Sequence, residues 1–479
     1  MQLKLSRQLL ALLCVGLTVL VYLVNPFGVG ANANKVIGFA VLMISLWVTE
    51  ALPMPVVALL PLILFPLFRV APIDTTAASY ANPVIFLFMG GFMLGLAIEK
   101  WHLHRRIALN IVRLTGTSGD RIILGFIIST GLISMWLSNT ATTMMMFPIA
   151  LSVVKVLEVN HPQKAGLSNF AMSIMIAIAL ASNFGGIATL IGTPPNVAFA
   201  AFYNKRYNAT IAFSDWMLVC TPLAMLLLFF LYFVMVKWLY PNGMKSDAAT
   251  KTIIQNELLS LGVISKAEKR VFTIFLLTAA LWITKDLLNK VSPFKLDDNM
   301  IALIGATALF ITPSGTGNEP LLAWTDTKNM AWGILLLFGG GIALAGALEK
   351  AGLIEQLGLW FAQFGASPLM LIFLVTVISI FVSEVMSNVA QVIVFAPVVS
   401  GLAEAAHLHP LLLGIPMTLA ASCASMLPMG TPPNAIAFSS GYIKLNQMTK
   451  VGFVMNVISV VLITLFCWLL LPLVFNIQR

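Results

Sequence analysis

Apolar residues occur along the chain in long runs separated by short polar stretches. A run of about twenty apolar residues is long enough to cross a lipid bilayer as a helix. The runs fall near residues 8–24, 36–52, 54–70, 83–100, 122–150, 168–201, 216–238, 271–287, 299–313, 330–348, 368–400, 410–438 and 451–475. The pattern predicts an all-α polytopic membrane protein.

Two of these runs differ from the others. Residues 122–150 and 368–400 are each interrupted near the middle by a Ser-Asn pair. We interpret both as re-entrant hairpins that enter and leave on one side, which leaves about eleven transmembrane helices. With the N-terminus inside, most of the 27 Lys and Arg residues lie in cytoplasmic stretches, as membrane proteins favour. This layout predicts a cytoplasmic N-terminus and a periplasmic C-terminus in a cell inner membrane.

The first apolar run also invites a second interpretation. Lys4 and Arg7 precede it, and Ala31-Asn32-Ala33 resembles a signal-peptidase cleavage site. The run from 9 to 24 exceeds the ~7–15 residues of a signal-peptide core. We therefore expect a first membrane helix.

Composition narrows the class of protein. Of 479 residues 59% are hydrophobic and 9% are charged, whereas soluble domains carry roughly 25% charge. This excludes a soluble enzyme, a disordered chain and a nucleic-acid-binding module. An outer-membrane barrel is excluded too, because its strands would alternate apolar and polar residues. The net charge of +9 is explained by cytoplasmic loops, not by a nucleic-acid partner.

Cysteine and histidine patterns give weak signals for metal. The four cysteines are far apart in apolar runs, so we interpret them as packing residues: Cys14, Cys220, Cys423 and Cys467. The pairs His102/His104 and His407/His409 have a spacing that places the rings on opposite sides of a helix. No metal cluster is expected from them.

The chain contains an internal repeat. Residues 87–100 (LFMGGFMLGLAIEK) and 337–350 (LFGGGIALAGALEK) share eight of fourteen positions. Further along, Ser138-Asn139-Thr140-Ala141 is matched by Ser387-Asn388-Val389-Ala390, and Gly192-Thr-Pro-Pro-Asn196 recurs as Gly430-Thr-Pro-Pro-Asn434. In the layout above the repeats are inverted. Inverted repeats with interrupted helices are typical of secondary transporters, whose sites lie near the bilayer midplane.

The repeated motifs suit ion binding. Where two half-helices meet, backbone groups lack helical partners and survive at membrane depth only in protein or a watery cavity. Carbonyl, Asn and Ser oxygens can replace the hydration shell of sodium, and half-helix N-termini can receive a carboxylate. The Pro-Pro pairs predict an unwound stretch, with Thr left as a ligand. Glu384, near the second motif, either contacts an ion or braces the hairpin through hydrogen bonds.

With these motifs the whole chain resembles the divalent-anion/sodium symporters, which carry di- and tricarboxylates. The similarity rests on Trp47-Val-Thr-Glu50-Ala-Leu-Pro53, both Ser-Asn tips, both Gly-Thr-Pro-Pro-Asn breaks and their inverted order. The chain departs from the symmetric family pattern at Val389 and Gln391, where Thr is common.

The resemblance implies sites for Na+ and for a dicarboxylate. One sodium ion is expected at Ser134, Ser138, Asn139 and Gly192, and another at Ser383, the Met386 carbonyl, Asn388 and Gly430. Substrate carboxylates are expected at Asn139, Thr140, Thr193, Ser387, Asn388, Thr431 and Pro432.

The resemblance also implies a homodimer whose scaffold holds an elevator-type transport domain. Scaffold helices are expected in 1–121, with a basic interfacial helix at 101–121, and in 271–366. Transport-domain parts are expected in 122–240 and 367–479, with 241–270 as a cytoplasmic linker.

The favoured function is sodium-coupled symport of a C4-dicarboxylate such as succinate, malate or fumarate. Two rivals remain: an exchanger of dicarboxylates, citrate or 2-oxoglutarate without sodium coupling, and a carrier of sulfate or another inorganic dianion. No nucleophile with a base, no continuous polar pore and no intramembrane proton relay stands out, so an enzyme, a channel and a proton pump are disfavoured.

Overall fold

The computed structural model describes residues 6–160, 166–244, 248–293, 295–315, 319–356 and 367–477. Across this part of the chain the elements are helices. Ten of the helices it describes are long and apolar enough to cross a membrane. Shorter apolar helices in the described part of the chain lie at Met54–Leu67, Asp298–Ile311, Pro368–Ser383 and Leu411–Ser422. The prediction of an all-α polytopic membrane protein is confirmed.

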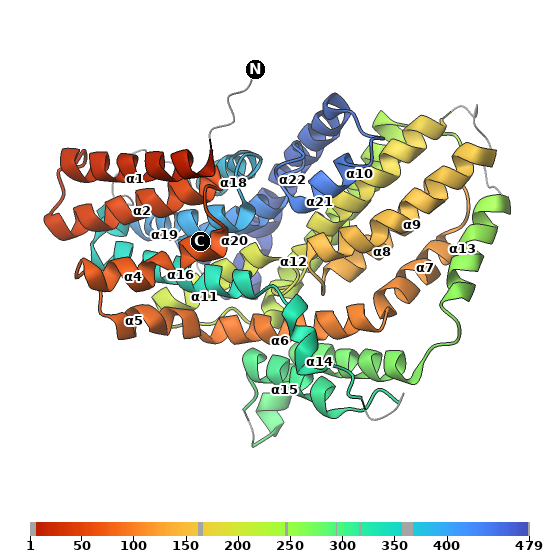
Figure 1. Cartoon of the computed structure of the whole chain (residues 1–479), viewed down its shortest axis with the longest axis horizontal. Coiled ribbons are helices and arrows are strands. Elements are labelled where there is room, and N and C mark those ends of the chain that lie inside the picture. Colours follow the sequence, from red (N-terminus) through yellow and green to blue (C-terminus); the bar gives the residue numbers. More distant parts are fainter. Residues whose placement is uncertain are drawn as a thin grey trace.

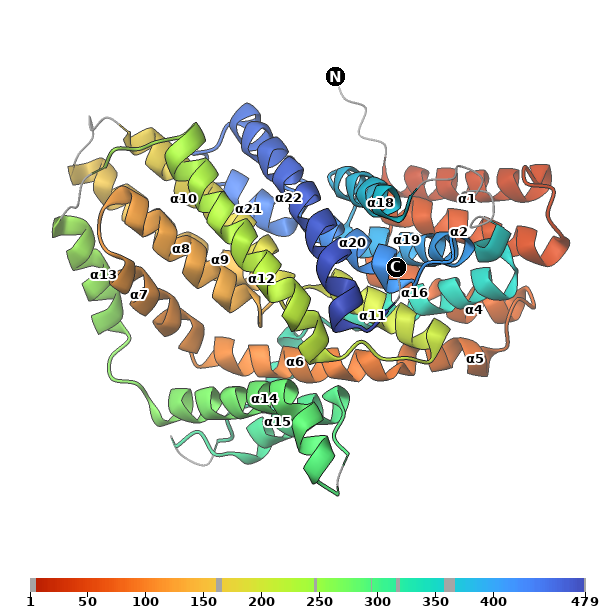
Figure 2. The ribbon, with the colours of Figure 1, turned by 180° about the vertical axis from the view of Figure 1, so that it is seen from behind.

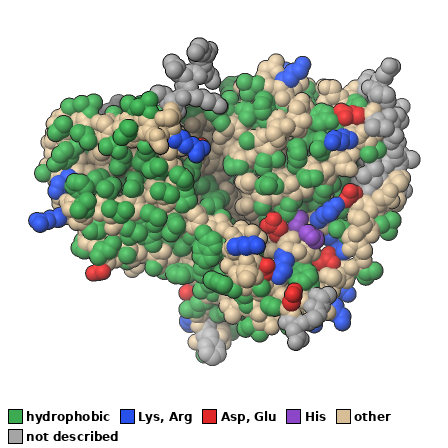
Figure 3. Space-filling model, viewed as in Figure 1, with side chains coloured by type: hydrophobic (Ala, Val, Ile, Leu, Met, Phe, Trp, Pro, Cys, Tyr) green, Lys and Arg blue, Asp and Glu red, His purple; other side chains and the backbone are tan. Residues whose placement is uncertain are grey.

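The first half of the chain begins with a group of apolar helices. These are α1 (Arg7–Val24), α2 (Ala31–Thr49), α3 (Met54–Ala58), α4 (Leu60–Leu67), α5 (Ile73–Ala78) and α6 (Pro83–Lys100). Ser6 caps α1 and Asn82 caps α6, each through a side-chain oxygen that accepts a backbone N–H. α1 packs on α2, and hydrophobic side chains cover the part of the surface that they form (Figure 3).

The repeated motifs lie in the helices that follow. They are α8 (Gly119–Ser134), α9 (Asn139–Asn160), α10 (Leu167–Gly186), α11 (Pro194–Tyr207) and α12 (Phe213–Tyr232), with a π-helical extension at Phe233–Leu239. The second half repeats the plan with α16 (Trp332–Lys350), α18 (Pro368–Ser383), α19 (Asn388–Ala405), α20 (Leu411–Ser422), α21 (Pro432–Phe438) and α22 (Leu445–Val474). Both predicted hairpins are therefore helix pairs broken at a Ser-Asn motif.

Figure 1 shows two groups of helices side by side. One contains α1, α2, α4, α5 and α16, the other contains α8, α9, α10 and α12, and the surface is hollowed between them (Figure 3). α14 (Lys266–Val291) and α15 (Asp298–Ile311) lie along α6, as both ribbon views show (Figure 2). The core is continuous across these groups.

The predicted basic helix at 101–121 is shorter than expected. It is α7 (Leu103–Thr115), and Gly116 ends it with φ 109°, a backbone conformation that glycine tolerates. The predicted linker at 241–270 is partly helical, with α13 at Ala248–Ser260. Part of that range, residues 245–247, lies outside the described residues.

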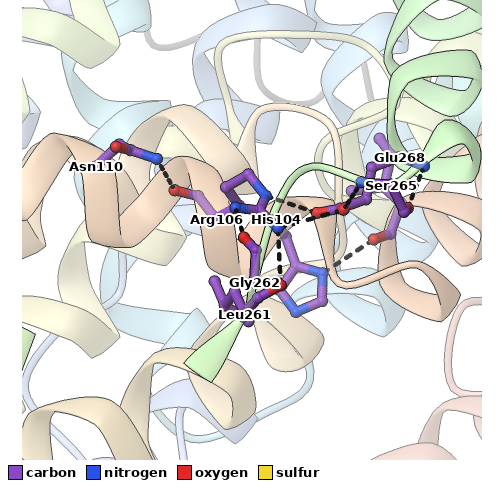
Figure 4. Close-up of polar contacts among 8 residues, drawn as sticks. His104, Arg106, Asn110, Leu261, Gly262, Ser265 and Glu268 are labelled. Atoms are coloured by element: carbon purple, nitrogen blue, oxygen red, sulfur yellow. Dashed lines mark hydrogen bonds and ion pairs between the residues drawn. The ribbon is translucent and has the colours of Figure 1, made fainter. Parts of the chain in front are cut away.

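Arg106 ties α7 to this linker (Figure 4). Its guanidinium donates to both carboxylate oxygens of Glu268, at 2.7 and 3.3 Å, and to the carbonyls of Leu261 and Gly262. Glu268 in turn forms a capping box with Ser265 at the start of α14. A bidentate pair of this kind fixes direction as well as distance, so α7 and α14 are held together.

All four cysteines are free and buried, as their interpretation as packing residues predicts.

Candidate functional site

The first Ser-Asn motif lies at the turn between α8 and α9. The Ser134 hydroxyl oxygen is 2.9 Å from Asn139 Oδ1 and 2.8 Å from the carbonyl oxygen of Ser182 on α10. A serine hydroxyl has one hydrogen, so it donates to only one of these acceptors at a time. Three oxygen atoms thus converge with one proton among them, a grouping that suits a hard cation such as sodium.

The second Ser-Asn motif repeats this geometry between α18 and α19. The Ser383 hydroxyl oxygen is 2.7 Å from Asn388 Oδ1 and 2.6 Å from the carbonyl oxygen of Ala421 on α20. Ser134 and Ser383 are both fully buried. The repeat found in the sequence is therefore also a repeat of oxygen clusters.

Both Gly-Thr-Pro-Pro-Asn motifs sit where a helix is broken. α10 stops at Gly186 and α11 starts at Pro194, while α20 stops at Ser422 and α21 starts at Pro432. The prolines occupy the first turn of the second half-helix, where a missing N–H costs nothing. The unwound stretch predicted at the prolines therefore precedes them.

The motif glycines allow oxygen atoms to crowd together. A Cβ on Gly192 would lie 2.4 Å from the Gly186 carbonyl oxygen and 2.9 Å from that of Met135, which no side chain permits. At Gly430 a Cβ would lie 3.3 Å from a Glu384 carboxylate oxygen. Carbonyl oxygens at unwound helices are the usual sodium ligands in transporters.

Two other predicted sodium ligands lie in the same turns. The Ser138 hydroxyl accepts the Ala141 N–H at 3.3 Å, so in this structure it caps α9. Met386 is half-buried between α18 and α19.

The predicted substrate residues differ in exposure. Asn139, Thr140, Ser387 and Asn388 are half-buried, Thr193 and Thr431 are buried, and Pro432 is exposed. The Asn139 amide donates to Thr193 Oγ1 at 3.4 Å, which joins the first tip to the first helix break. Amide and hydroxyl groups held this way can receive a carboxylate without a cationic side chain.

Asn183 joins the two halves, and the sequence analysis missed it. This residue of α10 is 1% exposed, and its amide donates to Thr431 Oγ1 and Asn434 Oδ1, each at 3.2 Å. The side-chain oxygen of Asn183, Oδ1, accepts a hydrogen bond from Asn139 Nδ2 at 3.5 Å. A Ser-Asn pair within a strongly apolar run at 182–183 was the available signal.

Glu384 braces the second half. One carboxylate oxygen accepts the N–H groups of Ser425 and Met426 at 2.8 and 2.9 Å and the Asn456 amide at 2.7 Å, and the other accepts the Leu427 N–H at 3.0 Å. These bonds hold the unwound stretch that follows α20. Of the two roles considered for Glu384, this geometry supports the hydrogen-bonded brace.

The two tips differ in what surrounds them. Trp136, at the first tip, stacks on Phe213 and on Trp282 of α14, with ring centroids 6.2 and 6.4 Å away. Val385, at the second tip, is 66% exposed. The first tip is docked against α14, whereas the second has no such cover among the described residues.

Of the two departures from the family pattern, one is fully buried. Gln391 is buried, and its amide donates to Ser379 Oγ at 2.5 Å between α18 and α19. Val389 is half-buried in the first turn of α19.

Two of the solved structures that the fold resembles are transporters. The Alcanivorax borkumensis YdaH transporter matches with a TM-score of 0.58 at 14% identity, over 82% of this chain and 87% of that one. Neisseria gonorrhoeae MtrF, whose structure is described as illuminating a class of antimetabolite efflux pumps, matches with a TM-score of 0.53 at 12% identity, over 83% of both chains. At these identities the likeness concerns the fold.

Relatives found by sequence comparison are more similar to this chain than these structures are. The sodium-dependent dicarboxylate transporter SdcS of Staphylococcus saprophyticus is 38% identical over 470 residues, or 96% of this chain and 90% of that protein. SdcS of Staphylococcus aureus is 38% identical over 92% of this chain and 87% of that protein. The family model described as the sodium:sulfate symporter transmembrane region matches residues 3–475, so the chain belongs to the sodium:sulfate symporter family.

Proposed function

We propose that this protein is a secondary transporter that couples sodium entry to uptake of a C4-dicarboxylate such as succinate. The observation that carries the proposal is the pair of matching oxygen clusters, one at Ser134 and Asn139 and one at Ser383 and Asn388. The similarity to the SdcS transporters, which are named for sodium and dicarboxylates, supports the same ions and substrate class.

Coupling follows from the charge of the proposed site. Its predicted substrate residues offer hydroxyl and amide groups and no Lys or Arg, so a dianion depends on bound sodium for electrostatic compensation. Asn183 connects the first tip to Thr431 of the other half, which lets both clusters contribute to one anion site. If more than two sodium ions accompany one dianion, the membrane potential adds about 2.3 kcal/mol per net charge per 100 mV.

We propose that the sodium ions and the substrate carboxylates bind at the residues predicted from the sequence. One sodium ion would be held by Ser134, Ser138, Asn139 and Gly192, and the other by Ser383, Met386, Asn388 and Gly430. The carboxylates would meet Asn139, Thr140, Thr193, Ser387, Asn388, Thr431 and Pro432.

For the movement we propose an elevator. The helices of 122–240 and 367–479 would move together against a scaffold built from 1–121 and 271–366. Two contacts cross this boundary and would have to change during the movement: Trp136 docks on α14, and Arg206 of α11 pairs with Glu349 of α16 at 3.0 Å. The scaffold would form a homodimer in a bacterial cell membrane, with the N-terminus cytoplasmic and the C-terminus outside.

Uptake into proteoliposomes tests this function. Radiolabelled succinate is offered to vesicles under an inward sodium or potassium gradient, and the vesicles are either empty or loaded with unlabelled succinate. We expect uptake into empty vesicles with sodium and none with potassium. Excess unlabelled sulfate is added in a parallel set and is expected to leave succinate uptake intact.

The alternatives give different results. Uptake that requires internal succinate and ignores sodium would make the protein an exchanger and refute the sodium sites. Labelled sulfate that enters with sodium while succinate does not would make it an inorganic dianion carrier.

A further inference from the structure

A cavity of about 600 Å³ lies away from the two Ser-Asn tips. It is lined by the start of α2, by α5, by the α16 face and by Lys205 near the end of α11. Ligand-binding pockets in proteins are typically about 300–1,000 Å³, so the space accommodates a small organic anion or a lipid headgroup. None of the proposed sodium or substrate residues lines it.

Small residues on α16 keep this cavity open. Ala343, Gly346, Ala347 and Lys350 line it and are spaced so that they share one face of the helix. A Cβ added to Gly346 would meet no atom within 4 Å, so the space extends to the helix backbone. A methyl group at this position would enter the cavity without displacing its neighbours.

The charged side chains that line the cavity have one sign. Lys205 and Lys350 both line it, and none of the described lining residues carries a carboxylate. Within the described chain neither lysine forms an ion pair. The nearby Glu349 and Glu404 share one partner, Arg206, at 3.0 and 2.7 Å, so this trio carries one net negative charge against the two positive charges of the lysines.

The N-terminus of α2 adds to this positive potential. Gly30, the residue before the helix, offers no side-chain cap, and residues 30–33 line the cavity. Uncapped N–H groups at a helix start carry a partial positive charge that favours anions. The buried Ser79 hydroxyl lies in the same wall and can donate to an oxyanion, whereas the Thr76 hydroxyl already donates to the Pro72 carbonyl at 2.9 Å.

We propose that this cavity is a second anion site, which binds an oxyanion group between Lys205 and Lys350. The shared chemistry is a carboxylate or phosphate oxygen in contact with two ammonium groups and a helix N-terminus. The oxyanion comes either from a dicarboxylate in solution or from the headgroup of an anionic phospholipid.

Equilibrium dialysis of the purified full-length protein tests the site. The probes are radiolabelled succinate and short-chain phosphatidylglycerol, each in sodium-free choline buffer, so that the proposed transport site lacks its coupling ion. The variants are Lys205→Gln/Lys350→Gln, which removes both charges, and Gly346→Leu, which fills the space. Lys290→Gln/Lys295→Gln is the matched charge control, and Gly16→Leu, at a glycine that also has open space around it, is the matched volume control.

We expect saturable binding of at least one probe to the wild type, weakened about tenfold or more by both cavity variants and unchanged in both controls. Binding of succinate alone identifies a dissolved anion, and binding of phosphatidylglycerol alone identifies a lipid. The proposal is overturned if neither probe binds saturably, or if the cavity variants bind as well as the controls. Because binding is read without sodium, failure here leaves sodium-coupled transport standing.

Discussion

Replacing Asn183 by Ala tests whether the two halves act as one site. Asn183 donates to Thr431 Oγ1 and Asn434 Oδ1, and both acceptor residues are buried. Thr431 Oγ1 retains a backbone partner, the Asn434 N–H at 3.3 Å, but Asn434 Oδ1 loses its donor. A buried polar group without a partner costs about 1–3 kcal/mol, and the lost bond to Thr431 adds about 1 kcal/mol.

The expected loss of stability is about 2–4 kcal/mol in total. It weakens the contact between the first tip and the second helix break. If about 1.4 kcal/mol of it is expressed in ligand binding, the apparent sodium affinity for succinate uptake falls tenfold. The measurement is the sodium dependence of uptake in proteoliposomes, together with the melting temperature in detergent with and without sodium.

Asn169→Ala is the matched control for this variant. Asn169 lies on the same helix, is half-buried, and donates to the Pro241 carbonyl at 3.0 Å, far along the chain from any repeated motif. The reasoning is refuted if Asn183→Ala and Asn169→Ala show the same sodium dependence and the same melting temperature.

Three further predictions concern Glu384, Trp136 and His104. Glu384→Ala removes the acceptor of three backbone N–H groups, one buried and two part-buried, and is expected to lower the melting temperature clearly. Glu384→Gln retains one acceptor and should fall between it and the wild type; equal melting of both variants would contradict the brace. Trp136→Ala removes the stacking on α14 and is expected to change the uptake rate more than Val385→Ala at the other tip; equal rates would count against docking. Burial lowers the pKa of His104 from 6.5 to about 4. As the pH drops from 6.5 to 4, the unfolded chain therefore gains a proton before the folded protein does. The stability of the folded protein should fall over this pH range. A pH series of melting temperatures should show a shallower fall in His104→Gln; an identical fall would contradict this origin.

The sequence was informative wherever a motif marks a break in the backbone. Serine, asparagine, glycine and proline disfavour a continuous apolar helix for local reasons, so both tips and both helix breaks could be placed before the structure was known. The position of the unwound stretch relative to the prolines was wrong by a few residues. Proline is tolerated in the first turn of a helix, so it marks the start of the second half and not the unwound segment itself.

The roles of Asn183 and Glu384 could not be obtained from the sequence. Asn183 acts through contacts with Thr431 and Asn434, about 250 positions away, and no local pattern encodes that pairing. Glu384 could be identified as an intramembrane acid, but its donors come from α22 and from the stretch after α20. Tertiary packing decides which buried polar groups meet, whereas helix breaks are decided locally.

The central claim is that each Ser-Asn tip holds a sodium ion and that both hold the anion together. Simultaneous flux of radioactive sodium and labelled succinate into proteoliposomes tests it most directly. The account predicts at least two sodium ions per succinate, with both fluxes lost in Asn139→Ala and in Asn388→Ala variants that assemble normally. Succinate entry without accompanying sodium, or full coupled flux in either variant, would contradict it.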